Sequence, residues 1–125
     1  MKTFSKTDIG MVREVNQDYV YVSDLPVGKL PNLFIVADGM GGHKAGEFAS
    51  RFTVEVVKDE LAKSTEEGPE AMIRQAITSA NQRLLETAKQ DSKLEGMGTT
   101  LVVATVIERT LYFANVGDSR LYLLN

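Results

Sequence analysis

Two periodicities of apolar residues divide the chain into strands and helices. Short runs rich in β-branched and aromatic residues, which are typical of strands, occur at residues 3–9, 18–24, 32–37, 99–107, 110–116 and 120–124. Between them, apolar residues spaced three and four positions apart predict two amphipathic helices, over residues 46–63 and 69–90. Residues 10–17 are expected to be a connection between the first two strands. The chain therefore has strands towards both ends and a helix pair in the middle.

The run at residues 99–107 is almost continuously apolar, which indicates a strand covered on both faces. We expect helices on one face of its sheet and a second sheet on the other, a layered α+β sandwich rather than a βαβ repeat. The sequence stops at RLYLLN, where the last strand is barely finished. We therefore expect residues 1–125 to be the N-terminal part of a single longer domain, because that strand would otherwise be a bare edge.

Composition narrows the classes of protein. With 43% hydrophobic and 25% charged residues, the chain has no disorder signature and no apolar run of the length that spans a bilayer. A net charge of −3 gives no reason to expect a nucleic-acid partner. The absence of cysteine excludes disulfides, thiolate metal sites and cysteine nucleophiles. The first residues do not form a secretory signal, so a cytoplasmic location is the expectation.

The stretch FIVADGMGGHKAGEFAS joins a buried strand to a helix through Asp38 and four glycines. A carboxylate at a strand end is an efficient ligand for a hard cation such as Mg²⁺ or Mn²⁺. Gly39 would let its own carbonyl join the ligands, while Gly41, Gly42 and Gly46 would let the chain turn before the helix. Two other readings stay open: Asp38 accepts backbone hydrogen bonds in the connection, or the stretch is a phosphate loop, whose usual spacings it lacks.

Three polar residues crowd the segment IGMVREVNQDYVYV, on the expected connection between strands. Arg13 has the forked donors that clamp a phosphate, and with Asn16 and Asp18 it falls within six residues. Asp18 could hold a water bound to a metal. The alternative is a surface turn in which Arg13 pairs with Glu14 or Asp18. A further carboxylate, Asp118, lies at the tip of the turn VGDSR between two apolar strands.

Other candidates have ordinary alternatives. His43, the only histidine, is either a proton donor near the glycines or an exposed loop residue, and Lys44 either holds an anion or is simply solvated. Met40, Met72 and Met97 are expected to fill the core or loops, because thioethers suit soft metals.

Four motifs occur in a fixed order: RxxNQD at 13–18, DGMGGHxAGExAS at 38–50, GMGTT at 96–100 and NVGDSR at 115–120. Over nearly its whole length the chain thus resembles the metal-dependent Ser/Thr protein phosphatases of type 2C, in their bacterial form. The resemblance implies two antiparallel sheets packed face to face between helix pairs. It also implies hydrolysis of phosphoserine and phosphothreonine in proteins by a water activated by two Mn²⁺ or Mg²⁺ ions, opposite a Ser/Thr kinase in bacterial signalling.

By motif position, the resemblance gives each candidate a role. Asp38 would bridge the metals, Gly39 would offer its carbonyl oxygen, Asp18 would act through a metal-bound water, Asp118 would reach an additional, weaker metal, and Arg13 would bind the substrate phosphate. Eukaryotic members usually place a histidine, as a candidate general acid, where this chain has Met40. We therefore favour a metal-bound water as the proton donor.

The family's later SDG-like and DN motifs do not occur in these 125 residues. Three carboxylates are too few to hold two divalent ions tightly, so the segment alone is expected to be inactive or nearly so. Strand exchange with a second copy is one way to complete the sheets. The alternative functions are a truncated, non-catalytic phosphatase-like binding module and a generic phosphate or nucleotide binder.

Overall fold

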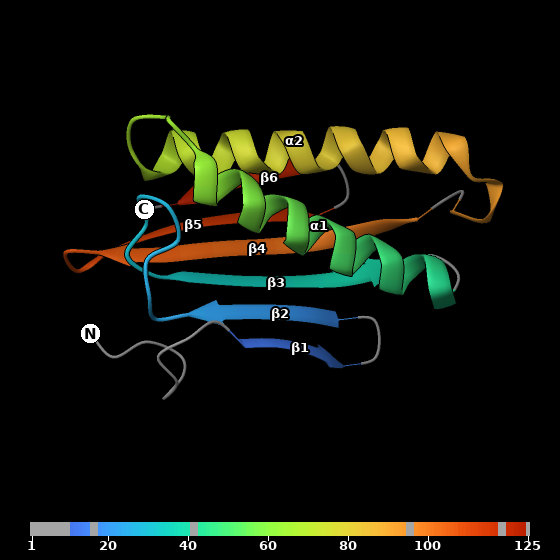
Figure 1. Ribbon diagram of the computed structural model, residues 1–125, viewed down its shortest axis with the longest axis horizontal. Helices are drawn as coiled ribbons and strands as arrows, with labels where there is room; N and C mark the ends of the chain where they lie inside the picture. Colours follow the sequence, from blue (N-terminus) through green and yellow to red (C-terminus); the bar gives the residue numbers. More distant parts are fainter. Residues whose placement is uncertain (1–10, 16–17, 41–42, 95–96, 118–119, 125) are drawn as a thin grey trace.

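The computed structural model describes residues 11–15, 18–40, 43–94, 97–117 and 120–124 (Figure 1). They form a six-stranded antiparallel sheet in which the strands follow one another in chain order. The strands are β1 (Met11–Val15), β2 (Asp18–Ser23), β3 (Leu33–Met40), β4 (Gly98–Ile107), β5 (Thr110–Gly117) and β6 (Arg120–Leu124). Between β3 and β4 the chain forms α1 (His43–Lys63), α2 (Pro69–Gln90) and the short 3₁₀ helix η1 (Ser92–Leu94).

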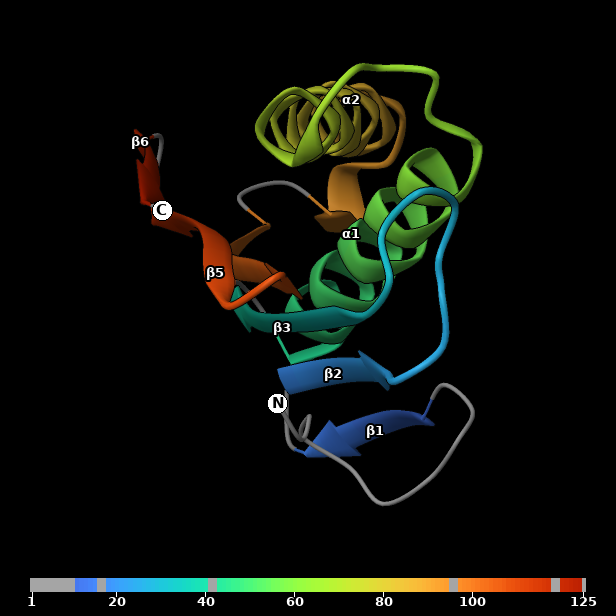
Figure 2. The same ribbon diagram turned by 90° about the vertical axis from the view of Figure 1, so that its left-hand side faces the viewer.

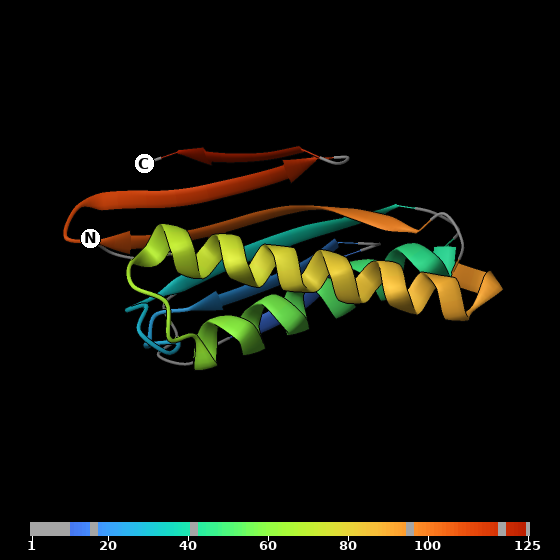
Figure 3. The same ribbon diagram turned by 90° about the horizontal axis from the view of Figure 1, so that it is seen from above.

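Both long helices lie on the same face of the sheet (Figures 2 and 3). α1 packs across β2, β3 and β4, and α2 packs beside α1 and reaches β4 and β5. The core between these layers comes from alternate strand positions and from one stripe of each helix. Its fully buried members include Leu33, Ile35, Ala37, Val54, Val57, Leu61, Ile73, Ala76 and Val103. Each of the larger side chains stabilises the fold by about 1.5–3 kcal/mol through removal from water.

The helix predictions are confirmed, with one shifted boundary. α2 has the predicted limits, since Gly68, at a φ of 88°, and Pro69 begin it. α1 begins at His43 rather than at residue 46, so Gly46 lies inside the helix and not in a turn before it. Gly41 and Gly42, which were expected to turn the chain, lie outside the described residues.

The first strand differs from the prediction. Residues 3–9 lie outside the described part of the chain, while β1 occupies most of the segment that was expected to be a connection. Val15 pairs with Asp18, so only two residues separate β1 from β2, the spacing of a tight β-hairpin. The polar residues of MVREV hid this strand, because an edge strand needs no continuous apolar run.

The start of β3 is tied to the end of β4 by Asn32. Its Nδ2 donates to the Val106 carbonyl at 2.9 Å, and its Oδ1 accepts from the Val106 N–H at 2.8 Å. The buried Thr105 hydroxyl donates to the main-chain carbonyl of Asn32 at 2.7 Å. These bonds extend the β3–β4 ladder by one residue, at the end of β3 opposite to Asp38.

The α+β class is confirmed, and the described residues cover one face of the sheet with helices (Figure 2). On the other face, Val20, Val36 and Val102 share one register row and are each half-buried. Within the described ranges, no second sheet packs on that face. No helix among these residues has the length and apolarity needed to cross a membrane.

Candidate metal centre

Asp18 and Asp38 are direct partners in the β2–β3 ladder. Opposite residues of an antiparallel pair lie on one face of the sheet with Cβ atoms about 4.5–5.5 Å apart. Because Ile35 and Ala37 are buried under the helices and side chains alternate, both aspartates lie on the face away from the helices. Asp38 was predicted to follow its strand, but β3 continues through Met40, so the ladder fixes its backbone on both sides.

Asp38 perturbs the titration of Asp18. The pKa of Asp18 is raised from its ordinary value of 3.8, first by a side-chain hydrogen bond with Asp38, then by burial, then by repulsion from the Asp38 charge. Asp18 is half-buried and Asp38 is exposed. A divalent cation would relieve the repulsion, and carboxylate oxygens are the ligands that Mg²⁺ and Mn²⁺ prefer, so the donor set fits such an ion.

The two carboxylates alone are not a complete set of metal ligands. Among the described residues, no group of three or more His, Cys, Asp or Glu side chains is placed to hold a metal ion. Asp118 lies outside the described residues, between the end of β5 and the start of β6. Val116 pairs with Leu101, which in turn pairs with Ala37. β5 therefore ends on the side of the sheet where the β3 strand carries Asp38.

Arg13 was predicted on a connection between strands, but it lies within β1. It pairs with Val20, and its position is therefore two residues along the ladder from Asp18. Asp18 is the first residue of β2, as the strand predicted over residues 18–24 requires, and Asn16 lies outside the described residues. The hairpin thus places position 13 at the middle of the β1–β2 ladder and position 18 at its hairpin end.

Gly39 is required by close packing. Gly39 is buried, and a Cβ built on it would overlap the main-chain carbonyl of Gly46 in the first turns of α1. Its φ is not positive, so the glycine serves contact rather than an unusual backbone angle. The beginning of α1 therefore lies directly on the strand segment that carries Asp38.

The other candidates behave largely as their ordinary alternatives. Lys44 is exposed on α1, and Met72 is buried in the core. His43 is the first residue of α1, so its assignment to a loop was wrong. Met97 is half-buried beside the start of β4, and Met40 ends β3.

Sequence reasoning gave the GMGTT motif no role of its own. Its last three residues begin β4 and pair one by one with the DGM segment of β3: Gly98 with Met40, Thr99 with Gly39 and Thr100 with Asp38. Asp38 therefore has Asp18 on one side and Thr100 on the other. The occurrence of this motif in order with the other three could have indicated that it belongs to the site. The strand with which it pairs could not be predicted from the sequence.

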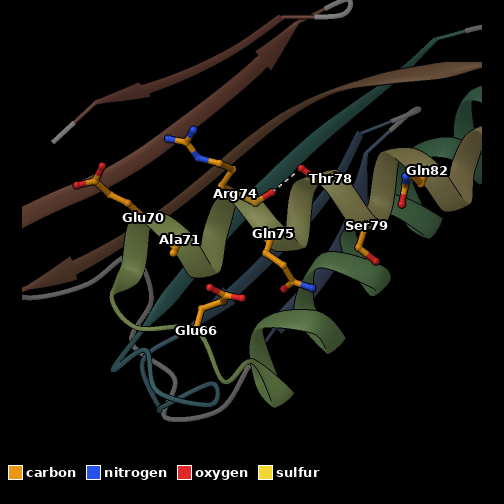
Figure 4. A pocket seen from close by; sticks show the side chains of 8 residues that line it. All are labelled: Glu66, Glu70, Ala71, Arg74, Gln75, Thr78, Ser79 and Gln82. Atoms are coloured by element: carbon orange, nitrogen blue, oxygen red, sulfur yellow. Dashed lines mark hydrogen bonds between the residues drawn. The ribbon is translucent and has the colours of Figure 1, made fainter.

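An open hollow lies elsewhere, on the outer side of α2 (Figure 4). It has a volume of about 690 Å³ and is lined by polar groups such as Glu66, Arg74 and Gln82. It lies nearer the α1–α2 turn than the edge of the sheet where β3 ends (Figure 1). Arg74 and Thr78 are joined there by an ordinary helical bond, from the threonine hydroxyl to the Arg74 carbonyl at 2.9 Å. This open hollow has no part in the aspartate site.

Fold and site together define an α+β protein in which two aspartates pair across neighbouring strands, at one end of an antiparallel sheet. The family model described as Protein phosphatase 2C matches residues 12–124, and the chain belongs to this family.

Named relatives agree with this assignment. The chain is 40% identical over 123 residues to Serine/threonine phosphatase stp of Listeria monocytogenes, covering 95% of this chain and 48% of that protein. It is 35% identical over 124 residues to Serine/threonine protein phosphatase PstP of Mycobacterium tuberculosis, covering 96% and 22%. The chain thus spans about half the length of the first of these relatives, and less of the second.

Solved structures show the same fold. The crystal structure of Stp1 from Staphylococcus aureus matches with a TM-score of 0.71 and 30% identity, over 94% of this chain and 50% of that one. The catalytic domain of PstP in complex with two manganese ions matches with a TM-score of 0.64 and 30% identity, over 94% and 52%.

Proposed function

We propose that these residues are the N-terminal part of a catalytic domain that hydrolyses phosphoserine and phosphothreonine in proteins with the help of Mn²⁺ or Mg²⁺. The observation that carries the proposal is the register of Asp18 and Asp38, which sets two carboxylates side by side on one face of the sheet. Relatives named as Ser/Thr phosphatases support the substrate class, and the PstP structure with two manganese ions supports the choice of metal.

In this proposal each residue has a separate task. Asp38 would be a ligand shared by the ions, Asp18 would support them from the neighbouring strand, and Gly39 would offer its carbonyl oxygen. Arg13 would bind the substrate phosphate with its forked donors. Asp118 adds a carboxylate for a further, weaker ion. The bound ions supply Lewis-acid charge and a water nucleophile at neutral pH. We assign the proton for the leaving alkoxide to a water that the metal ions would hold rather than to His43.

We further propose that the 125 residues alone hydrolyse phosphate esters slowly or not at all, because they carry too few carboxylates at the site. A second copy that exchanges strands would supply more of them. The complete protein would act in the cytoplasm, against a Ser/Thr kinase that makes its substrates.

The test is hydrolysis of p-nitrophenyl phosphate and of phosphopeptides by the complete protein, with and without Mn²⁺. We expect activity to need the ion and to be abolished by Asp38→Ala. Asp59→Ala, at an exposed position of α1, is the matched control and should leave activity unchanged. Activity that survives Asp38→Ala or prolonged chelation would contradict the metal mechanism. Mn²⁺ binding without any hydrolysis would instead favour the non-catalytic binding module.

A further inference from the structure

One carboxylate is buried between the two long helices. The side chain of Glu60, on α1, is only 8% exposed, and each of its two oxygens has a partner on α2. Gln75 donates from Nε2 to Oε1 at 3.2 Å, and Figure 4 shows its side chain extending from α2 towards α1. Arg83 donates from its guanidinium group to Oε2 at 3.2 Å, and Lys63 adds an ion pair to the same oxygen at 3.5 Å. The proposed phosphatase chemistry uses none of these groups.

The two donors on α2 lie on either side of the carboxylate along the helix axis. Gln75 and Arg83 are eight residues apart, which is about 12 Å of helix. With the half-buried Ser79 they form one row at i, i+4 and i+8. A shift of α2 by one turn, about 5.4 Å, in either direction would break one of the two bonds to Glu60. Together these bonds define a single position of α2 along α1.

The other contacts between the helices are less specific for that position. The attraction between apolar surfaces is non-directional, so it does not by itself select one alignment. The connection between the helices has five residues, 64–68, and can span about 17 Å, which is enough to allow a shift of one turn. The buried stripe of α2 is Met72, Ile73, Ala76, Ile77, Ala80 and Leu84.

The buried charge adds little net stability of its own. Removing a carboxylate from water costs free energy, which offsets much of its attraction to nearby cations. The cations here are well hydrated, since the side chains of Arg83 and Lys63 are 50% and 67% exposed. An apolar side chain of similar length would therefore cost little stability at position 60. It would not replace the direction that the two hydrogen bonds from α2 impose.

We propose that Glu60 sets the register of α2 on α1, and that its main contribution is to select one alignment of the helices rather than to stabilise the fold. This inference concerns the helix layer, so it does not depend on the proposed function. The failure of either proposal would leave the other intact.

The experiment measures the distance between two spin labels by double electron–electron resonance in the complete protein. These 125 residues contain no cysteine, so Asp59→Cys on α1 and Lys89→Cys on α2, both at exposed positions, provide the attachment sites. Cysteines elsewhere in the complete protein would first be replaced by serine. We expect one narrow distance in this labelled protein. Adding Glu60→Met should broaden the distribution or add a second distance shifted by about 5 Å, with little change in the urea midpoint.

Glu55→Met is the matched control. It makes the same substitution on α1 and removes a solvent-exposed ion pair, Lys58 to Glu55 at 3.4 Å, that does not involve α2. Its distance distribution should equal that of the labelled protein without it. If Glu60→Met does not fold, Glu60→Gln removes the charge with less change of shape and gives the same comparison.

The outcomes decide the inference. A single unshifted distance in the folded Glu60 variant would overturn it, whatever happens to the urea midpoint. A distance that stays single while the midpoint falls would show that Glu60 is only a stabilising group. Equal broadening by Glu55→Met and Glu60→Met would also overturn it, because the bonds to α2 would then not be the cause.

Discussion

The aspartate pair should make the metal-free fold less stable than it could be at neutral pH. We expect Asp18→Asn to raise the melting temperature in EDTA, because an amide can donate a hydrogen bond to Asp38 and cannot ionise. Register partners with Cβ atoms about 5 Å apart repel by about 1 kcal/mol when both are charged and water screens them. Asp38 is exposed, so the value for charges screened by water applies. For a domain of this size, about 1 kcal/mol corresponds to roughly 3–5 °C.

The pH dependence of the stability gain tests whether ionisation of Asp18 is its cause. The pKa of Asp18 is raised in the folded state, so folding favours its protonated form. The resulting penalty is absent below the ordinary value of 3.8, grows as the pH rises from there through the folded pKa, and is complete above it. The gain from Asp18→Asn should therefore be full at pH 7 and shrink towards zero as the pH falls to about 4.

Thermal unfolding followed by circular dichroism measures this gain from pH 4 to pH 8 in low salt. Asp59→Asn, at an exposed position of α1, is the matched control and should change the melting temperature little at any pH. Mn²⁺ should reverse the order of the two proteins, since it stabilises only the form that binds it. A loss of stability at pH 7, or a gain that is the same at pH 4 and pH 7, would refute the reasoning.

Three further substitutions test other parts of the structure. Gly39→Ala should destabilise the fold by about 1–3 kcal/mol or more, because its Cβ would overlap the Gly46 carbonyl and push α1 off β3; urea unfolding measures it. Asn32→Ala should cost about 1–3 kcal/mol, since it removes both side-chain bonds to the Val106 backbone; hydrogen exchange at Val106 should rise with it. Arg13→Ala should raise KM for phosphate monoesters in the complete protein more than it lowers kcat.

The substitutions at Gly39 and Arg13 have controls within the chain. Gly68→Ala meets no atom within 4 Å and carries only the backbone cost of a positive φ, so a larger loss there than at Gly39 would contradict the packing argument. Lys44→Ala removes an exposed cation from α1 and should leave KM unchanged. Unaltered kinetics in Arg13→Ala would return that residue to the surface-turn interpretation.

The elements that the sequence predicted well are those with strong local signals. The apolar stripe of α2, bounded by Gly68 and Pro69, predicted both of its limits, and continuous apolar runs predicted β3 and β4. β1 was missed because the adjacent charged residues Arg13 and Glu14 interrupt its apolar run, so that the segment resembles a loop. The start of α1 was placed too late because its first turn contains Gly46, a residue that usually interrupts helices.

The site was predictable as a set of residues but not as an arrangement. Asp18 and Asp38 were each singled out from their own surroundings, yet their pairing depends on the register between two strands, which no local pattern states. The same register gives Thr100 its place, and it explains why a motif without charged groups adjoins the metal site. The packing reason for Gly39 also appears only once α1 is seated on β3.

Because Asp18 pairs directly with Asp38, cation binding by the pair would depend on the correct register between β2 and β3. A slip of one residue between β2 and β3 would turn every side chain of β2 to the opposite face, and Asp18 would then point towards the helices. Misaligned chains would lose half of the carboxylate pair while keeping most of their backbone hydrogen bonds. Manganese added during refolding should therefore draw the population towards the native alignment, since only that alignment can retain the ion.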